Sequence, residues 1–216
     1  MTRWNAVYER KQHVYGKVGN GLVWQYLHEA PAGPVLDVGC GEGRNGMMAA
    51  RLGRRTLGLD LSHVAVERAN HMAAVEGLPF EGRVANVATY EYPTGTYAMV
   101  IGALVLPFVR KSEVVALLEQ FRRATLPGGL VYLSALRSDD PDAQAHVGHF
   151  PEIEPGCFWK PQLEEHRSFF DSGELRRMAE AAGYQAVEYL EGAFLDAPDG
   201  EAPHYHQQVQ LVARVN

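Results

Sequence analysis

Residues 34–53, PVLDVGCGEGRNGMMAARLG, carry the strongest structural signal in the chain. They run from an apolar segment through Gly39, Gly41 and Gly43 into a segment with helical spacing. Glycine is unfavourable inside regular structure, and it is favoured where φ must be positive or where a ligand must approach the backbone closely. The stretch therefore predicts a strand, a glycine loop and a helix. The loop is either a plain tight turn or a ligand-binding site.

Apolar runs alternate with helix-length segments along most of the chain. Strands are expected over 35–38, 56–60, 83–87, 97–105, 130–136, 184–190 and 207–215. Helices are expected over 43–53, 62–77, 112–126 and 170–183. Strands separated by helices indicate βαβ units and a parallel sheet, and apolar runs are typical of strands covered on both faces. The last two strands have no helix between them. We therefore expect an α/β fold with a doubly wound, mostly parallel seven-stranded sheet whose last strand is antiparallel.

The length of 216 residues predicts a single domain over 1–216 with a substantial core. Within it we expect an N-terminal helical cap at 1–30, where apolar and aromatic residues recur at helical spacing. Residues 137–168 are rich in Asp, Pro and His and are expected to be irregular. Long irregular insertions are commonly functional, so this segment is a candidate lid or substrate-specificity insertion.

Composition excludes several classes of protein. Lys and Arg number 20 and Asp and Glu number 26, a net charge of −6 with no basic run, which argues against nucleic-acid binding. The longest apolar run, 98–109, is shorter than the roughly 20 residues of a membrane span. The polar N-terminus is unlike a signal peptide. Cys40 and Cys157 are far apart and show no metal-ligand spacing, so we expect two thiols, no metal site and a cytoplasmic protein.

Two features favour a ligand on the glycine loop. The loop opens a helix, whose first N–H groups attract anionic groups. Asp60 ends the second predicted strand, 21 residues after Gly39, where an acid can accept both ribose hydroxyls of an adenosine. A dinucleotide site has the pattern G-x-G-x-x-G, whereas the third glycine here comes one residue earlier. A NAD-dependent oxidoreductase is therefore the less favoured alternative.

The loop resembles the first motif of the class I S-adenosylmethionine-dependent methyltransferases, an acid followed by x-G-x-G-x-G, here Asp37 to Gly43. The resemblance covers residues 30–135, and the seven-stranded sheet of that family, with its antiparallel last hairpin, matches the expected strands. It implies the Rossmann-like methyltransferase fold. Within this group GCGEGRN, RRATLPGGLVYLSA and FDSGELRRMAEAAGY are most similar to the TehB-type tellurite-resistance methyltransferases. Related small-molecule methyltransferases share much of this finer pattern.

The resemblance implies S-adenosylmethionine as the cofactor and gives roles to several residues. Asp37 would reach its amino group, Arg44 would pair with its carboxylate and Asp60 would hold the ribose. Leu61 would pack on the adenine. Asn86 stands near the place where the family has an acid, and its amide oxygen can accept from the adenine amine. The full set of implied cofactor-binding residues is Tyr15, Asp37, Gly39, Cys40, Gly41, Gly43, Arg44, Asp60, Leu61, Asn86, Val87, Ala103 and Leu104.

The methyl acceptor is less constrained by the sequence, and no residue is evident as a base. His204 and His206 lie in the expected last hairpin loop, and in a strand they would share one face. They are candidates for substrate binding, proton handling or an adventitious metal, or they are plain solvent-exposed histidines. Of the functional roles, the positioning of an anionic or soft nucleophile is the one we favour. We expect methyl transfer to a small molecule, such as a metalloid oxyanion or a thiol-like nucleophile, by a monomer or homodimer. The alternatives are a small-metabolite O- or N-methyltransferase and a non-catalytic S-adenosylmethionine-binding sensor.

Overall fold

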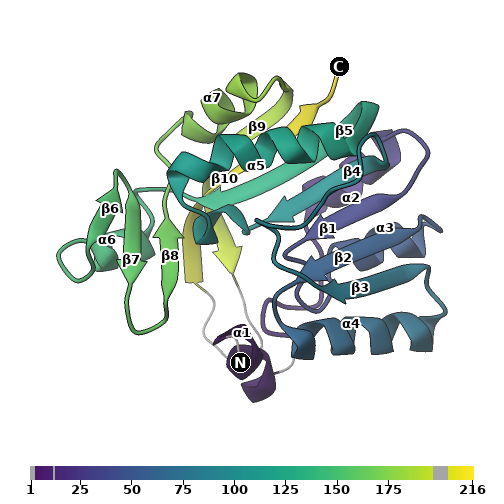
Figure 1. Cartoon of the computed structure of the whole chain (residues 1–216), viewed down its shortest axis with the longest axis horizontal. Coiled ribbons are helices and arrows are strands. Elements are labelled where there is room, and N and C mark those ends of the chain that lie inside the picture. The colour runs from purple at the N-terminus through teal and green to yellow at the C-terminus, as the bar shows by residue number, and fades with distance from the viewer. Residues whose placement is uncertain (1–2, 12, 197–203) are drawn as a thin grey trace.

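A seven-stranded sheet forms the centre of the computed structural model, which describes residues 3–11, 13–196 and 204–216 (Figure 1). In spatial order its strands are β3 (Phe80–Val84), β2 (Thr56–Asp60), β1 (Val35–Val38), β4 (Tyr97–Ala103), β5 (Thr125–Leu136), β10 (His204–Arg214) and β9 (Gln185–Asp196). The first five are mutually parallel, and β10 runs antiparallel to both β5 and β9. The expected mostly parallel sheet with an antiparallel end is confirmed.

Helices cover both faces of this sheet. The helices of the described residues are α1 (Arg3–Arg10), α2 (Gly21–Glu29), α3 (Gly46–Arg51), α4 (His63–Glu76), η1 (Leu106–Phe108), α5 (Lys111–Ala124), α6 (Pro141–His146) and α7 (Glu174–Ala181). Side chains along β4 point alternately to the two faces of the sheet, so a layer of helices is needed on each face. Met99 and Ile101 join the core cluster that contains α2, whereas Val100 joins the cluster that contains α5 and α7. Both faces of the central strands are therefore buried, which is the origin of their continuous apolar runs. No helix within the described residues is long and apolar enough to span a membrane.

The third strand lies at Phe80–Val84, not at the expected 83–87. Thr56 pairs with Phe80 and Asp60 with Val84, so the strand ends level with β2. Phe80 is buried among residues of α3 and α4 and anchors this register. Asn86 instead lies in a turn beyond the strand, where its side-chain oxygen accepts a hydrogen bond from the Ala88 N–H.

The insertion at 137–168 is ordered, and the expectation of an irregular segment is wrong. It holds α6 and a second, antiparallel sheet of β6 (Glu152–Glu154), β7 (Cys157–Lys160) and β8 (Glu165–Ser168). Figure 1 shows this small sheet beside one edge of the main sheet. Phe158 packs with Phe169 and Leu136, so a few buried side chains fasten the insertion to the end of β5.

The last two strands are longer than expected. His204 pairs with Asp196 and His206 with Phe194, so both histidines lie in β10 and not in a loop. The part of the expected loop at 197–203 lies outside the described residues. Extension of β10 carries His206 to the insertion, because the Arg137 N–H, just after β5, donates to the Gln207 carbonyl.

Candidate active site

The glycine loop connects β1 to α3 through three left-handed residues. The φ angles of Gly39, Gly41 and Gly43 are 66°, 53° and 82°, a region that side chains rarely adopt. A Cβ on Gly41 would lie 2.4 Å from the Tyr8 hydroxyl oxygen, so α1 approaches the bare backbone here. Gly39 and Gly41 face the cavity described below, whereas Gly43 packs against Met47.

Asp37 lies beneath this loop and is 1% exposed. Its Oδ2 accepts a 2.8 Å hydrogen bond from the Gly46 N–H at the start of α3, where the helix dipole favours a negative charge. Burial nevertheless raises the pKa of Asp37 to about 7. The structure shows Asp37 as a support for the loop and the helix, and its contact with the cofactor amino group stays a prediction.

Asp60 ends β2 at the cavity wall. Its Oδ2 accepts from the Gly41 N–H at 2.8 Å and its Oδ1 from the Ser62 N–H at 2.8 Å. Burial raises the pKa of Asp60, and the backbone bonds oppose this effect. A carboxylate has about four lone-pair sites, so Asp60 keeps acceptor capacity for a further donor. Two carboxylate oxygens side by side fit the two hydroxyls of a ribose.

Arg44 connects the glycine loop to the N-terminal segment. Its Nη1 donates to the Tyr15 carbonyl oxygen at 2.6 Å, and both residues line the cavity. The Val14 N–H donates to Glu42 Oε2 at 3.1 Å, which is a second tie between the same two segments. Arg44 therefore holds the chain between α1 and α2, and its pairing with a cofactor carboxylate stays a prediction.

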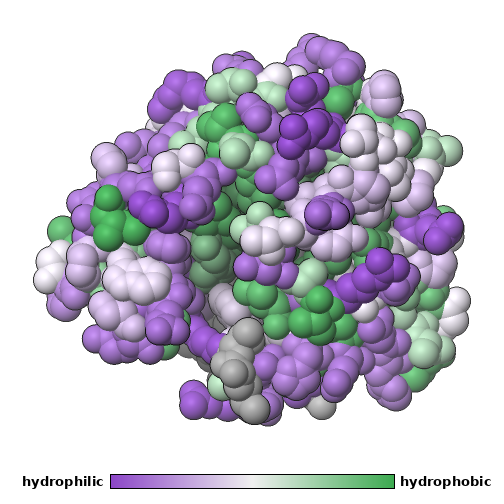
Figure 2. Space-filling view, in the orientation of Figure 1, coloured by the Kyte–Doolittle hydropathy of each residue, from purple (hydrophilic) through white to green (hydrophobic). Residues whose placement is uncertain are grey.

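The implied cofactor residues surround one cavity, except for Asp37 and Gly43, which lie outside its wall. Those that line it are Tyr15, Gly39, Cys40, Gly41, Arg44, Asp60, Leu61, Asn86, Val87, Ala103 and Leu104. The cavity lies at the carboxyl ends of parallel strands, where open α/β sheets bind their ligands. Figure 2 shows hydrophobic surface in the hollow between the small sheet and the rest of the molecule.

The same cavity has a second group of wall residues that the sequence analysis does not identify. Trp4 of α1 and Phe108 of η1 pack edge to face with ring centroids 4.9 Å apart, and the Arg167 guanidinium of β8 lies 4.8 Å from the Phe108 ring centroid. The spacing of Trp4 and Tyr8 on one helix is a usable signal. Arg167 has none, because the sequence does not predict β8.

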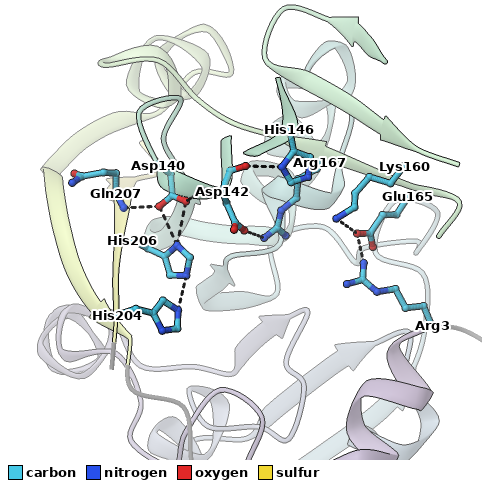
Figure 3. Close-up of polar contacts among 10 residues, drawn as sticks. All are labelled: Arg3, Asp140, Asp142, His146, Lys160, Glu165, Arg167, His204, His206 and Gln207. Carbon is cyan, nitrogen blue, oxygen red and sulfur yellow. Dashed lines mark hydrogen bonds and ion pairs between the residues drawn. The ribbon is translucent and has the colours of Figure 1, made fainter. Parts of the chain in front are cut away.

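His206 is the part of β10 that reaches the cavity (Figure 3). Its Nδ1 lies 3.0 Å from Oδ2 of Asp140, whose side chain is 0% exposed. Its Nε2 lies 3.1 Å from Nε2 of His204. Asp140 also accepts from the Gln207 N–H at 2.6 Å and from the Asp142 N–H at 2.8 Å, the latter as the N-cap of α6. His204, more exposed, lies outside the cavity wall.

Carboxylates accompany the cations around this end of the cavity (Figure 3). Arg167 Nη2 lies 3.2 Å from Asp142 Oδ2, and Glu165 pairs with Arg3. Lys160 Nζ lies 4.0 Å from the same Glu165, and burial lowers the pKa of Lys160. An anion at this end would therefore compete with carboxylates that are already in place.

Comparisons with known proteins agree with this architecture. Residues 35–129 match the family model described as a methyltransferase domain. The fold is similar to a crystal structure of SAM-dependent methyltransferases from Methanosarcina mazei, with a TM-score of 0.72 and 17% identity over 91% of this chain and 98% of that chain. TehB from Haemophilus influenzae gives a TM-score of 0.71 and 18% identity over 99% of this chain and 67% of that chain.

A third similar structure contains ligands. It is 1,6-didemethyltoxoflavin-N1-methyltransferase from Burkholderia thailandensis with bound 1,6-didemethyltoxoflavin and S-adenosylhomocysteine, with a TM-score of 0.67 and 18% identity over 91% of this chain and 77% of that chain. At these identities the structural neighbours show the Rossmann-like methyltransferase fold. Together with the match of residues 35–129 to a methyltransferase domain, this fold supports methyl transfer as the activity.

Proposed function

We propose that the protein transfers the methyl group of S-adenosylmethionine to a small organic molecule bound beside Trp4, Phe108 and His206. The supporting observation is that one continuous cavity joins Asp60 and the glycine loop to these three side chains. Catalysis of methyl transfer relies mainly on holding two reactants in line, so a shared cavity is the first requirement. The toxoflavin-precursor methyltransferase, a structural neighbour with a small organic molecule bound, agrees with this class of acceptor.

Residues of the chain fit the cofactor at one end of this cavity. S-adenosylmethionine supplies a methyl group bound to a positively charged sulfur. Asp60 offers two carboxylate oxygens to the ribose, and the backbone of Gly39 and Gly41 allows close approach by the methionyl part. Leu61 and Val87 supply apolar surface for the adenine. Ala103, the last residue of β4, and Leu104 also line the cavity and would flank the sulfonium group.

The acceptor side favours an organic molecule over a compact inorganic oxyanion. Its walls include the apolar side chains of Trp4, Phe108 and Leu136, which match an apolar or aromatic body. Its guanidinium, Arg167, already pairs with Asp142. The similarity to TehB nevertheless keeps a metalloid oxyanion or a thiol-like nucleophile as the second candidate.

The single domain 1–216 is proposed to use both of its peripheral segments for the acceptor. The N-terminal cap at 1–30 contributes Trp4 and Tyr15, and the insertion at 137–168 contributes Arg167. Both therefore act as specificity segments around a cofactor site formed by the central sheet.

Release of S-adenosylhomocysteine tests the proposal directly. The purified chain is incubated with S-adenosylmethionine and a panel of phenols, aromatic amines, thiols, selenite and tellurite. Turnover with an organic acceptor, lost in Asp60→Ala and kept in the surface variant Glu81→Ala, is the expected result. Turnover with selenite or tellurite alone would favour the second candidate. Tight cofactor binding without any turnover would contradict methyl transfer and favour the sensor.

A further inference from the structure

A buried carboxylate stands behind the one histidine that lines the described cavity. Asp140 is fully buried, and its two oxygens lie 3.0 Å and 3.2 Å from Nδ1 of His206. Two backbone N–H groups, of Asp142 and Gln207, fix the orientation of this carboxylate. Because Asp140 comes from the N-cap of α6 and His206 from β10, the pair connects the insertion to the main sheet. The imidazole ring is held with its other nitrogen directed away from Asp140.

When both imidazoles are neutral, only one assignment of donors and acceptors fits the hydrogen bonds among Asp140, His206 and His204. A carboxylate only accepts, so Nδ1 of His206 carries the proton and donates to Asp140. Nε2 of His206 then carries no proton and is an acceptor. His204, whose Nε2 lies 3.1 Å away, donates to it. The lone pair of Nε2 accepts from His204 in this arrangement, so an acceptor group that delivers its proton to Nε2 takes the place of His204 as the donor. Asp140 holds the ring by the same carboxylate–imidazole relation that orients histidine bases in other enzymes.

We propose that His206 is the general base of the methyl transfer, that Asp140 is its positioning residue, and that the acceptor carries a proton on its nucleophilic atom, as hydroxyl, amine and thiol groups do. This inference rests on the proposed function and narrows its acceptor class. It differs from the favoured sequence-based hypothesis, in which both histidines position an anionic or soft nucleophile, and it takes up the proton-handling alternative for His206. Asp140 accounts for the difference, because it is 66 residues from His206 in the sequence and meets it only in the fold.

The chemical step balances without a further reactant. The acceptor heteroatom forms a bond to the methyl carbon while the carbon–sulfur bond breaks and its electron pair returns to sulfur, giving neutral S-adenosylhomocysteine. The proton of the acceptor passes to Nε2 of His206. The imidazolium that forms keeps its Nδ1–H bond to Asp140, whose carboxylate stabilises the new positive charge. The proton leaves to solvent after the product.

A metal site is a weaker interpretation of the same side chains. Among residues 3–11, 13–196 and 204–216, no group of three or more His, Cys, Asp and Glu side chains could hold a metal ion. Nδ1 of His206 lies beside Asp140 and its Nε2 lies beside Nε2 of His204, so both nitrogens of His206 have hydrogen-bond partners (Figure 3).

Nitrogen-15 NMR of the histidine rings tests the proton arrangement without any acceptor. In the full chain at about pH 8, well above the ordinary histidine range, His206 is expected as the Nδ1–H tautomer. The signal is assigned by its loss in His206→Ala. Asp140→Asn is expected to change this tautomer population, whereas Asp139→Asn, at the exposed neighbouring carboxylate, leaves it unchanged. An Nε2–H tautomer of His206 in the unaltered protein would overturn the proposal.

Kinetics with acceptors of different acidity test the base itself. With a phenol that the unaltered protein methylates, His206→Ala is expected to lower kcat by about 100-fold or more, and added imidazole is expected to restore part of it. With iodide, which has no proton to lose, the two proteins are expected to differ by less than about threefold, because proximity and not base catalysis acts there. An equal loss with phenol and iodide, or full activity of His206→Ala with phenol, contradicts the base role. Failure of the unaltered protein on every acceptor instead contradicts the proposed function, and the base role falls with it.

Discussion

Gly41 is where the N-terminal helix meets the cofactor loop, and Gly41→Ala tests that contact. The backbone there has φ of 53°, a conformation that costs an alanine about 1–2 kcal/mol. Its Cβ would also lie 2.4 Å from the hydroxyl oxygen of Tyr8, a side chain only 3% exposed. Relief of that overlap requires the buried Tyr8 side chain, or α1 with it, to shift, and overpacking of this kind destabilises by about 1–3 kcal/mol. We expect a total loss of roughly 2–5 kcal/mol in the free energy of unfolding.

Two further variants separate the backbone effect from the overlap. Gly95 has φ of 57°, and a Cβ added there would meet no atom of the described residues within 4 Å, so Gly95→Ala should lose only the backbone part. Tyr8→Phe removes the hydroxyl, and in the double variant with Gly41→Ala it should recover about 1–3 kcal/mol. Urea unfolding gives the stabilities, and calorimetric titration gives the S-adenosylmethionine affinity, which should recover in parallel. The reasoning is refuted if Gly41→Ala is no less stable than Gly95→Ala, or if Tyr8→Phe gives no coupling.

Three other outcomes are expected. Asp60→Ala should weaken S-adenosylmethionine binding by about 1.5–3 kcal/mol in a calorimetric titration, while the exposed Glu81→Ala binds normally. Asp37 has a folded pKa of about 7 against an ordinary 3.8, so the folded state holds the proton more tightly and wild-type stability falls as pH rises between those values. Asp37→Asn should therefore gain up to roughly 4 kcal/mol relative to wild type between pH 4 and pH 8 by urea unfolding, and a constant difference would contradict the shift. Arg44→Ala should lower the affinity for S-adenosylmethionine and leave the melting temperature of the protein unchanged. If only the melting temperature falls, the role of Arg44 is limited to its hydrogen bond with Tyr15.

The cofactor end of the cavity could be predicted because its signals are local in the sequence. Positive φ requires glycine, so the loop is visible as closely spaced glycines between a strand and a helix. Asp60 could be predicted as a site residue because it is the last residue of the second strand, β2. The sequence predicts the edge strand three residues late because only one of its faces is covered. Phe80 and Gly82 are buried, and the charged, exposed Glu81 and Arg83 that alternate with them hide the pattern.

The acceptor end could not be predicted because its contacts are long-range. Strands β6 to β8 are short and rich in charge, and they are fastened by few buried residues, among them Cys157 and Phe158. Their sequence lacks the alternation that indicates a strand. The pairing of Asp140 with His206 joins the N-cap of a six-residue helix to a strand 66 residues later. Neither spacing nor residue type encodes such a contact.

The residues that the sequence predicts and those that it misses lie in different parts of the cavity. The matched methyltransferase domain ends at residue 129, and it contains the glycine loop and Asp60. Leu136, Arg167 and His206 come after it, and Trp4 comes before it. A cofactor of fixed structure demands the same residue types whichever molecule receives the methyl group, whereas the acceptor wall must fit that particular molecule. Under the proposed function, the choice of acceptor depends on the cap, the insertion and the end of β10. Replacing these segments should then change the acceptor, while Asp60 and the loop are expected to keep binding S-adenosylmethionine.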